Sequence, residues 1–312
     1  MLNRRHIRIK VMQSVYALIQ SGSADLAREE KFLNFSIIKI YDLYVLMYSL
    51  LLEIRNKAEE QQEIAKKKFL ATSEDINPNR KFVDNHFLVT LQDNSSLHKY
   101  LKDYKLTNWK EDSEYVALLW KEIKESAIFS DYLNNKQSSK EEDLTFIENI
   151  YTEIIAPNDK LYDYFESLNM SWVDDLPFVN TAFLKNLKKT TTKSVFNRER
   201  LFKDADDMEF ASNLLKKVAL HHDEFTEEID KTTPNWDTER IAEVDMILLK
   251  MALTEFVYFP SIPTRVTINE YLEIAKDYST AKSSFFINGV LDKFLKEYTT
   301  SGKIKKIGRG LL

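Results

Sequence analysis

The scarcity of glycine and proline is the feature that most limits the folds open to this chain. Only 5 glycines and 6 prolines occur in 312 residues. Sheet-rich folds need many tight turns, and those turns depend on the same two residue types. The sequence therefore predicts an all-α fold. The same scarcity leaves no room for a glycine-rich phosphate-binding loop.

The length suits one large domain or two ordinary ones, and 44% apolar residues are enough for a real core. The chain has no cysteine, which excludes disulfides, thiolate zinc sites and cysteine nucleophiles and fits a reducing compartment. Gln13 and Ser14 interrupt the apolar part of the N-terminus, so we do not interpret it as a signal peptide. The apolar run 44–52 is far shorter than a bilayer span and is expected to be a buried core helix. We therefore expect a cytoplasmic protein without a membrane partner.

Charge is distributed unevenly along the chain. The net charge is -5, which argues against a surface that coats nucleic acid uniformly. Both ends are nevertheless basic and free of acids over residues 1–22 and from residue 301 onward. The basic residues are Arg4, Arg5, Arg8 and Lys10 at the start, and Lys303, Lys305, Lys306 and Arg309 at the end.

Apolar periodicity predicts helices over most of the chain. A first helix spans 4–19 and is stopped by Gly22. One of its faces carries a core stripe, and another carries Arg5, Arg8, Met12 and Tyr16. A long helix is predicted over 32–69, and another over 205–230. The stretch 236–296 contains three helices in succession, the second opened by a reciprocal cap between Thr267 and Glu270.

Several of these segments resemble the transcription antitermination factor family NusB. The similar runs are Arg4-Arg5-His6-Ile7-Arg8 with Gln13-Ser14-Val15-Tyr16, the segment from Asp245 to Glu255, Val266-x-Ile268-Asn269-Glu270, Glu273-x-Ala275-Lys276, and Phe286-Ile287-Asn288-Gly289-Val290-Leu291-Asp292. The resemblance covers the two ends of the chain and leaves out the long middle. It implies a double helical bundle with a long helical insertion between the first helix and the rest of the core.

This resemblance also implies a division of the chain. Residues 1–22 would form the first helix of the NusB-like core, and 205–298 would form its remainder. Residues 23–204 would be a helical insertion or extension, and 299–312 a basic C-terminal tail. Whether the insertion forms a separate lobe or extends the first bundle is left open, as is the choice between monomer and dimer.

The function that the resemblance implies is binding without turnover. Such proteins pair with the small-subunit ribosomal protein NusE and bind the boxA element of ribosomal RNA leaders. They join the RNA polymerase antitermination complex, support read-through of terminators and assist ribosomal RNA synthesis.

The resemblance also implies candidate site residues. Each of them has an alternative, purely structural interpretation. Arg4, Arg5, Arg8, Lys10 and Tyr16 would hold RNA phosphates and bases, or else form a solvated face with a half-buried tyrosine. Lys282 and Phe286, four residues apart, would extend that surface, or else Phe286 packs beneath the insertion. Phe286 and Asp245 would face the protein partner, or else Asp245 is a first-turn acid favoured by the helix dipole.

Two rival functions belong to other classes. A helical protein-interaction scaffold would use the insertion as its working surface and would show no preference for boxA. A ribosomal RNA methyltransferase would need a glycine-rich nucleotide loop, which the sequence lacks. Adjacent histidines such as His221 and His222 point about 100° apart on a helix, so we expect no metal site. Nothing resembles a catalytic constellation, and we predict neither enzyme activity nor a cofactor.

Overall fold

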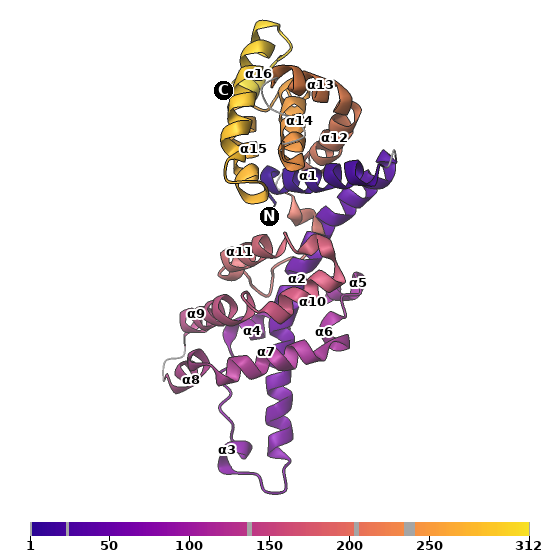
Figure 1. Cartoon of the computed structure of the whole chain (residues 1–312). Coiled ribbons are helices and arrows are strands. Elements are labelled where there is room, and N and C mark those ends of the chain that lie inside the picture. The colour runs from indigo at the N-terminus through magenta and orange to yellow at the C-terminus, as the bar shows by residue number, and fades with distance from the viewer. Residues whose placement is uncertain (1, 23–24, 136–138, 203–205, 234–240, 312) are drawn as a thin grey trace. The chain divides into compact units, whose positions relative to one another are not determined.

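The structure is a computed structural model that describes residues 2–22, 25–135, 139–202, 206–233 and 241–311. The expected all-α class is confirmed, because no strand occurs in these ranges. The predicted domain boundary at 204/205 and the start of the predicted stretch 236–296 lie outside the described residues. The helices are α1 Arg4–Ser21, α2 Leu26–Lys66, α3 Ser73–Ile76, α4 His86–Gln92, α5 Ser95–Asp103, α6 Asn108–Glu111, α7 Ser113–Glu125, α8 Ala127–Asn134, α9 Lys140–Ile150, α10 Asp159–Leu168, α11 Leu176–Leu187, α12 Asp207–Leu220, α13 His222–Thr232, α14 Glu243–Tyr258, α15 Thr264–Tyr278 and α16 Ser283–Thr300 (Figure 1).

The chain divides into two compact units. Unit 1 comprises residues 1–37 and 202–312, and unit 2 comprises residues 38–201. The division falls inside the 41-residue helix α2, so its first turns pack with unit 1. Within unit 1, for example, Lys216 of α12 pairs with Glu30 of α2 at 2.8 Å. That unit 2 is an insertion into a NusB-like core stays a prediction.

Helix α14 is the centre of unit 1. It packs against α1, α12, α13, α15 and α16 (Figure 1). Because it has neighbours around its circumference, residues 247–256 are all buried, and they include polar side chains. A helix that is surrounded in this way does not need a polar face.

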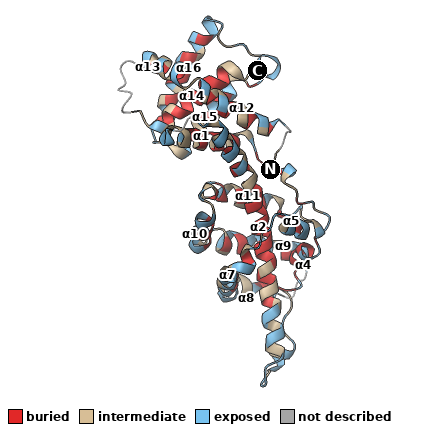
Figure 2. Cartoon of the chain, turned by 90° about the vertical axis from the view of Figure 1, so that its right-hand side faces the viewer, coloured by how far each residue is buried: buried red, intermediate tan, exposed pale blue. Residues whose placement is uncertain are grey.

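Helix α2 is the centre of unit 2. The segment from Tyr41 to Leu52 is fully buried, and in Figure 2 the middle of α2 is red while its far end is pale blue. By length and composition α2 could cross a membrane, but 83% of its apolar window is buried against the rest of the protein. The expectation that residues 44–52 form a buried core helix therefore holds.

A buried ion pair fixes α2 to its neighbours in unit 2. The Asp42 carboxylate is completely buried and accepts hydrogen bonds from Lys39, from the Tyr100 hydroxyl at 2.6 Å and from Arg198 at 2.7–2.8 Å. A buried charge is tolerated only when it is paired in this way. The cluster links α2, α5 and the short 3₁₀ turn Arg198–Leu201.

Two local predictions were wrong. The single helix expected over 205–230 is two helices, α12 and α13, separated at His221, whose ring stacks on Tyr258 with centroids 4.5 Å apart. The expected cap between Thr267 and Glu270 does not form, because α15 already begins at Thr264. Thr267 is buried instead, and its hydroxyl donates to Glu255 at 3.1 Å.

Candidate nucleic-acid interface

The N-terminal turns of α1 place three arginines against three other helices of unit 1. Gly22 ends the helix as predicted, with a left-handed φ of 58° that favours glycine. Arg4 donates to Asp207 of α12 at 3.1 Å. Arg5 donates to both carboxylate oxygens of Glu270 on α15 at 3.0 Å. The arginines of the predicted basic face are therefore paired with acids of the same unit.

Arg8 differs most from expectation, because its side chain is only 2% exposed. Its guanidinium donates to both oxygens of Glu255 on α14, at 2.6 and 2.8 Å. Thr267 and the Tyr271 hydroxyl, the latter at 2.7 Å, donate to the same carboxylate. The two oxygens of Glu255 thus accept four hydrogen bonds, and Arg8 is a structural residue rather than an exposed RNA contact.

The electrostatics of this cluster follow from its burial. Burial opposes charge on Arg8, but the charge and hydrogen bonds of Glu255 raise the pKa of Arg8 above its usual value. Burial, together with the negative charge of Glu255, raises the pKa of Tyr271 well above its usual value. Burial, reinforced by the positive charge of Arg5, lowers the pKa of His6 to about 4. At neutral pH Arg8 is therefore charged and His6 is neutral.

Two more residues of the predicted RNA face behave differently from each other. Lys10 is 2% exposed, so it is buried and cannot present its amine to an RNA phosphate without rearrangement. Tyr16 is 42% exposed and keeps a ring surface available at the other end of α1. The helix thus presents Arg4, Arg5 and Tyr16, and buries Arg8 and Lys10.

The second group of candidates lies at the N-terminal end of α16, where Lys282 is the N-cap. Lys282 is exposed and Phe286 is half-buried. The neighbouring Phe285, which we did not predict, is 81% exposed. Ile287 is fully buried, and at 100° per residue Phe285 lies about 200° from it. The helical pattern around Ile287 could therefore have identified Phe285 as the more outward ring.

Asp245 also differs from expectation, since it is 5% exposed and lies beneath the surface. Its Oδ2 accepts a hydrogen bond from the Ser283 hydroxyl at 2.7 Å, which ties the start of α14 to the start of α16. Among the described residues its Oδ1 has no hydrogen-bond partner. A buried carboxylate of this kind holds α16 in place and does not face a partner protein directly.

Gly289 lies on the exposed side of α16. A Cβ built on this residue would meet nothing within 4 Å, so the glycine does not serve a close approach of a neighbouring helix in this chain. Together with Phe285, one turn earlier, it leaves an accessible strip on the outer face of α16. Such a strip can accommodate a base or a partner side chain.

Part of the basic tail is engaged within unit 1. Lys303 pairs with Glu228 at 2.6 Å and with Glu224 at 3.3 Å. The Lys306 amine donates to the carbonyls of Glu255 and Phe259 at 2.9 and 3.0 Å, and so caps the end of α14. Lys305 and Arg309 remain exposed.

The described residues contain no group of three or more metal-ligating side chains. What the fold and this surface define is an all-helical module that offers arginine, tyrosine, lysine and phenylalanine side chains on its exterior. That combination belongs to the class of nucleic-acid- and protein-binding modules.

Comparison with known proteins identifies the family. A family model described as NusB family matches residues 176–296. The transcription antitermination protein NusB of Salinibacter ruber is 40% identical over 115 residues, which are 37% of this chain and 72% of that protein. The NusB proteins of Methylacidiphilum infernorum and Chloroherpeton thalassium are 42% and 37% identical over 94 and 114 residues, or 30% and 36% of this chain and 66% and 54% of theirs. The chain belongs to the NusB family, as its sequence resemblance indicated. No solved structure matches it.

The family match also bears on how the chain is divided. The match begins at residue 176, in α11. We had expected the remainder of the core to begin later, at residue 205. The match does not include α1 or the greater part of unit 2. Most of residues 38–201 therefore has no counterpart in the family match.

Proposed function

We propose that this protein is an RNA-binding transcription antitermination factor. The observation that supports the proposal most strongly is the 40% identity over 115 residues to a protein named transcription antitermination protein NusB. Like that family in general, it would act by binding and not by catalysis. It would work in the cytoplasm, as part of an antitermination complex on RNA polymerase.

The finer partners that we propose are boxA-type single-stranded RNA and ribosomal protein NusE. Arg4, Arg5 and Tyr16 of α1, with Lys282, Phe285 and Phe286 of α16, are the exposed or half-exposed candidates for the RNA. Arginine and lysine would contact phosphates, and the aromatic rings would stack on unpaired bases. The strip of Phe285 and Gly289 is the proposed contact for the protein partner.

The pairing of the arginines sets a condition on this proposal. A phosphate that binds Arg5 must compete with Glu270 for the same guanidinium. Lys282 has no ion pair among the described residues, so RNA can reach it without breaking one. We therefore expect Lys282 to contribute more to RNA affinity than either arginine.

The test is a filter-binding titration of boxA RNA against a scrambled RNA of equal length, with and without NusE, over a range of salt concentrations. The variant Lys282→Glu should weaken binding and lower the salt slope by roughly 0.7, the value for one contact to a single strand. Tyr16→Ala should weaken binding without changing the slope. Arg8 is unsuitable for this test because its loss would disturb the core.

Lys296→Glu is the matched control, since it makes the same charge change inside α16, about 21 Å along the helix axis from Lys282 at its N-cap. Equal affinity for boxA and scrambled RNA would refute the proposed RNA specificity. Equal effects of Lys282→Glu and Lys296→Glu would refute the assignment of the surface.

A further inference from the structure

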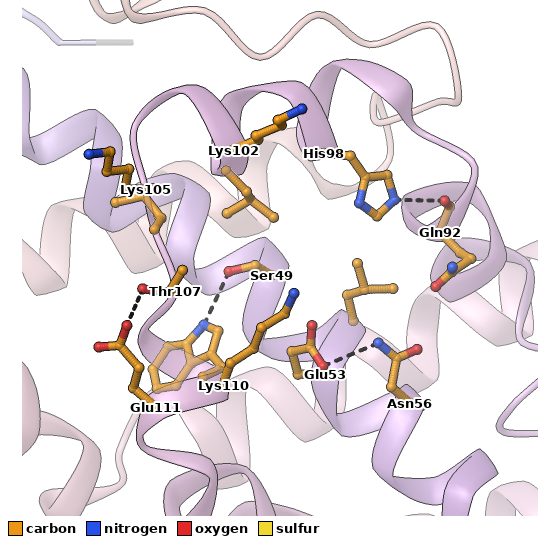
Figure 3. A pocket seen from close by; sticks show the side chains of 14 residues that line it. Ser49, Glu53, Asn56, Gln92, His98, Lys102, Lys105, Thr107, Lys110 and Glu111 are labelled. Carbon is orange, nitrogen blue, oxygen red and sulfur yellow. Dashed lines mark hydrogen bonds between the residues drawn. The ribbon is translucent and has the colours of Figure 1, made fainter.

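Unit 2 contains a groove that the antitermination function does not explain. The groove has a volume of about 850 Å³. It lies between the middle of α2, helix α5 and the short helix α6 (Figure 3). This volume is large for a protein pocket, since small-molecule sites occupy roughly 300–1,000 Å³.

The floor of the groove is apolar. Leu52 and Trp109 are buried, while Leu101 and Leu106 are half-buried and remain partly accessible. The Trp109 indole donates inward, to the carbonyl of Leu46 at 3.0 Å and to Ser49 at 3.1 Å. The tryptophan is therefore a rigid part of the floor and does not offer its ring to a ligand.

Three lysines, Lys102, Lys105 and Lys110, line this floor. Figure 3 shows Lys102 and Lys105 along one side and Lys110 on the opposite side, with its amine extending into the space between. All three are exposed, and none has an ion pair within the described part of the chain.

The two acids that line the groove are already hydrogen-bonded by their neighbours. Glu111 accepts from the Thr107 hydroxyl at 2.6 Å, and Glu53 accepts from the Asn56 amide at 3.2 Å. The three lysine charges exceed the two carboxylate charges, and the lysine charges have no partner. Unpaired cations around an apolar floor are complementary to a ligand that carries acids beside apolar side chains.

The backbone conformation of one of these lysines also supports a binding function for the groove. Lys105 has a φ of 52°, and no other non-glycine residue in the described ranges has a positive φ. A left-handed conformation at a residue other than glycine is unfavourable, and such strain concentrates at binding sites.

We propose that this groove binds an acidic amphipathic helix of a partner protein. Leucine-sized side chains of that helix would enter the floor between Leu101 and Leu106, and its carboxylates would pair with Lys102, Lys105 and Lys110. Helix binding in an apolar groove with charges along its edges is a common mode of peptide recognition. The site lies wholly in unit 2, and this proposal does not depend on the RNA function of unit 1.

Single-stranded RNA fits the groove less well. Sequence-tolerant RNA binding needs exposed rings on which bases stack. Trp109 is only 4% exposed, and the groove has no other phenylalanine, tyrosine or tryptophan among its lining residues. Its one exposed ring is the imidazole of His98, whose Nε2 is hydrogen-bonded to the Gln92 carbonyl at 2.9 Å. RNA is therefore the alternative that the experiment must separate from a peptide.

The experiment measures fluorescence anisotropy on the full-length protein. The probe is a labelled peptide of about 16 residues, with leucines at helical spacing and glutamates between them. A peptide of the same composition in scrambled order and a labelled oligouridine are measured in parallel. We expect saturable binding of the amphipathic peptide and weaker binding of the other two.

The variant Lys102→Glu/Lys105→Glu/Lys110→Glu should weaken binding of the peptide by at least about tenfold. The control Lys160→Glu/Lys188→Glu/Lys189→Glu makes the same charge change at exposed lysines of unit 2 outside the groove, and should change the affinity by less than about twofold. Because all six lysines are exposed, both variants should fold, which circular dichroism checks.

Three results would overturn the proposal. The first is the absence of saturable peptide binding up to about 1 mM. The second is an equal loss of affinity in the two triple variants. The third is tighter binding of oligouridine than of the peptide, lost in the groove variant, which would make the groove an RNA site.

Discussion

In unit 1, Glu255 joins three helices through its buried carboxylate. It is completely buried, yet its carboxylate is fully satisfied by Arg8, Thr267 and Tyr271. Removing one partner of such a buried pair leaves an uncompensated charge, which is far more costly than the net value of the pair itself. The stability of unit 1 should therefore respond strongly to substitutions at this point.

Arg8→Met is predicted to lower the free energy of unfolding of unit 1 by about 3–5 kcal/mol, because Glu255 is left buried and unpaired. Lys231→Met is the control, because both members of its ion pair with Glu227 are exposed (75% and 73%) and the pair should contribute less than about 1 kcal/mol. Urea unfolding measures both values. Similar losses for the two variants would contradict the role given to Glu255.

His6 makes the stability of unit 1 depend on pH. Its folded pKa, lowered by burial to about 4, lies below the unfolded value of 6.5, so the unfolded state binds more protons between those values. We expect stability to be complete above about pH 6.5 and to fall as the pH decreases toward 4. His222, whose pKa is lowered first by burial and then by Lys250, changes stability in the same direction.

Unfolding midpoints measured across this pH range in the native protein and in His6→Gln would test the assignment. The variant should show a flatter decline, because one titrating group has been removed while His222 remains. A decline as steep as that of the native protein would exclude His6 as a contributor.

At the scale of elements, α16 contains a glycine that helix packing does not explain. Gly289 lies inside a helix, where glycine is unfavourable by about 1 kcal/mol relative to alanine. The space around it is open, so packing does not require the glycine. Under the proposed function, the missing side chain lets a ligand approach the backbone of α16 closely.

Gly289→Ala is predicted to stabilise unit 1 by about 0.5–1 kcal/mol in thermal unfolding. Gly22→Ala, by contrast, should destabilise it, because φ at that position is 58°. If Gly289→Ala were destabilising, α16 would have to be packed more closely than the structure shows. A loss of partner binding in the stabilised variant would support the outer face of α16 as an interface.

The C-terminal segment docks through a close backbone contact. The amide of Ile307 donates to the carbonyl of Pro260 at 3.0 Å, and a Cβ on Gly310 would lie 1.9 Å from that same carbonyl oxygen. Gly310→Ala should therefore displace the segment and increase hydrogen exchange over residues 303–311. The control Leu311→Ala removes a side chain that is 74% exposed and should leave exchange unchanged. Equal protection in both variants would contradict the docking.

The sequence was informative where periodicity and end signals are strong. It predicted α1 and its end at Gly22, the buried α2 and the all-α class. It could not show that Arg8 and Lys10 are buried, because burial of a charge depends on partners such as Glu255 that lie far away in the chain. For the same reason the role of Asp245 beneath Ser283 and the tail contacts of Lys306 were not predictable. The helix break at His221 was also not predictable, because no glycine or proline lies near it in the sequence.

At the scale of the whole molecule, each unit has its own buried ion pair. Unit 1 is held by Arg8 and Glu255, and unit 2 by Asp42 and Arg198. The two clusters share no residue. Substitutions in one cluster should therefore act on its own unit, and effects of distant independent sites usually add.

Asp42→Asn is predicted to increase hydrogen exchange in α5 and around residues 198–201, and to leave α14 and α15 protected. Arg8→Met should show the opposite pattern, and the double variant should combine the two. Loss of protection throughout the chain in either single variant would indicate that the units unfold together, which would contradict this prediction.

The ion pairs of α1 have a consequence for biosynthesis. Its arginines are satisfied by Asp207, Glu255 and Glu270, all of which are translated after unit 2. The acids follow their arginines by 203, 247 and 265 residues, which the ribosome adds in about 10–50 s at roughly 5–20 residues per second. During that interval the N-terminal helix has emerged without its acidic partners, and α2 and its surrounding helices can fold first. The nascent chain therefore presents its arginines uncompensated for tens of seconds, a period in which chaperones or nearby ribosomal RNA can reach them.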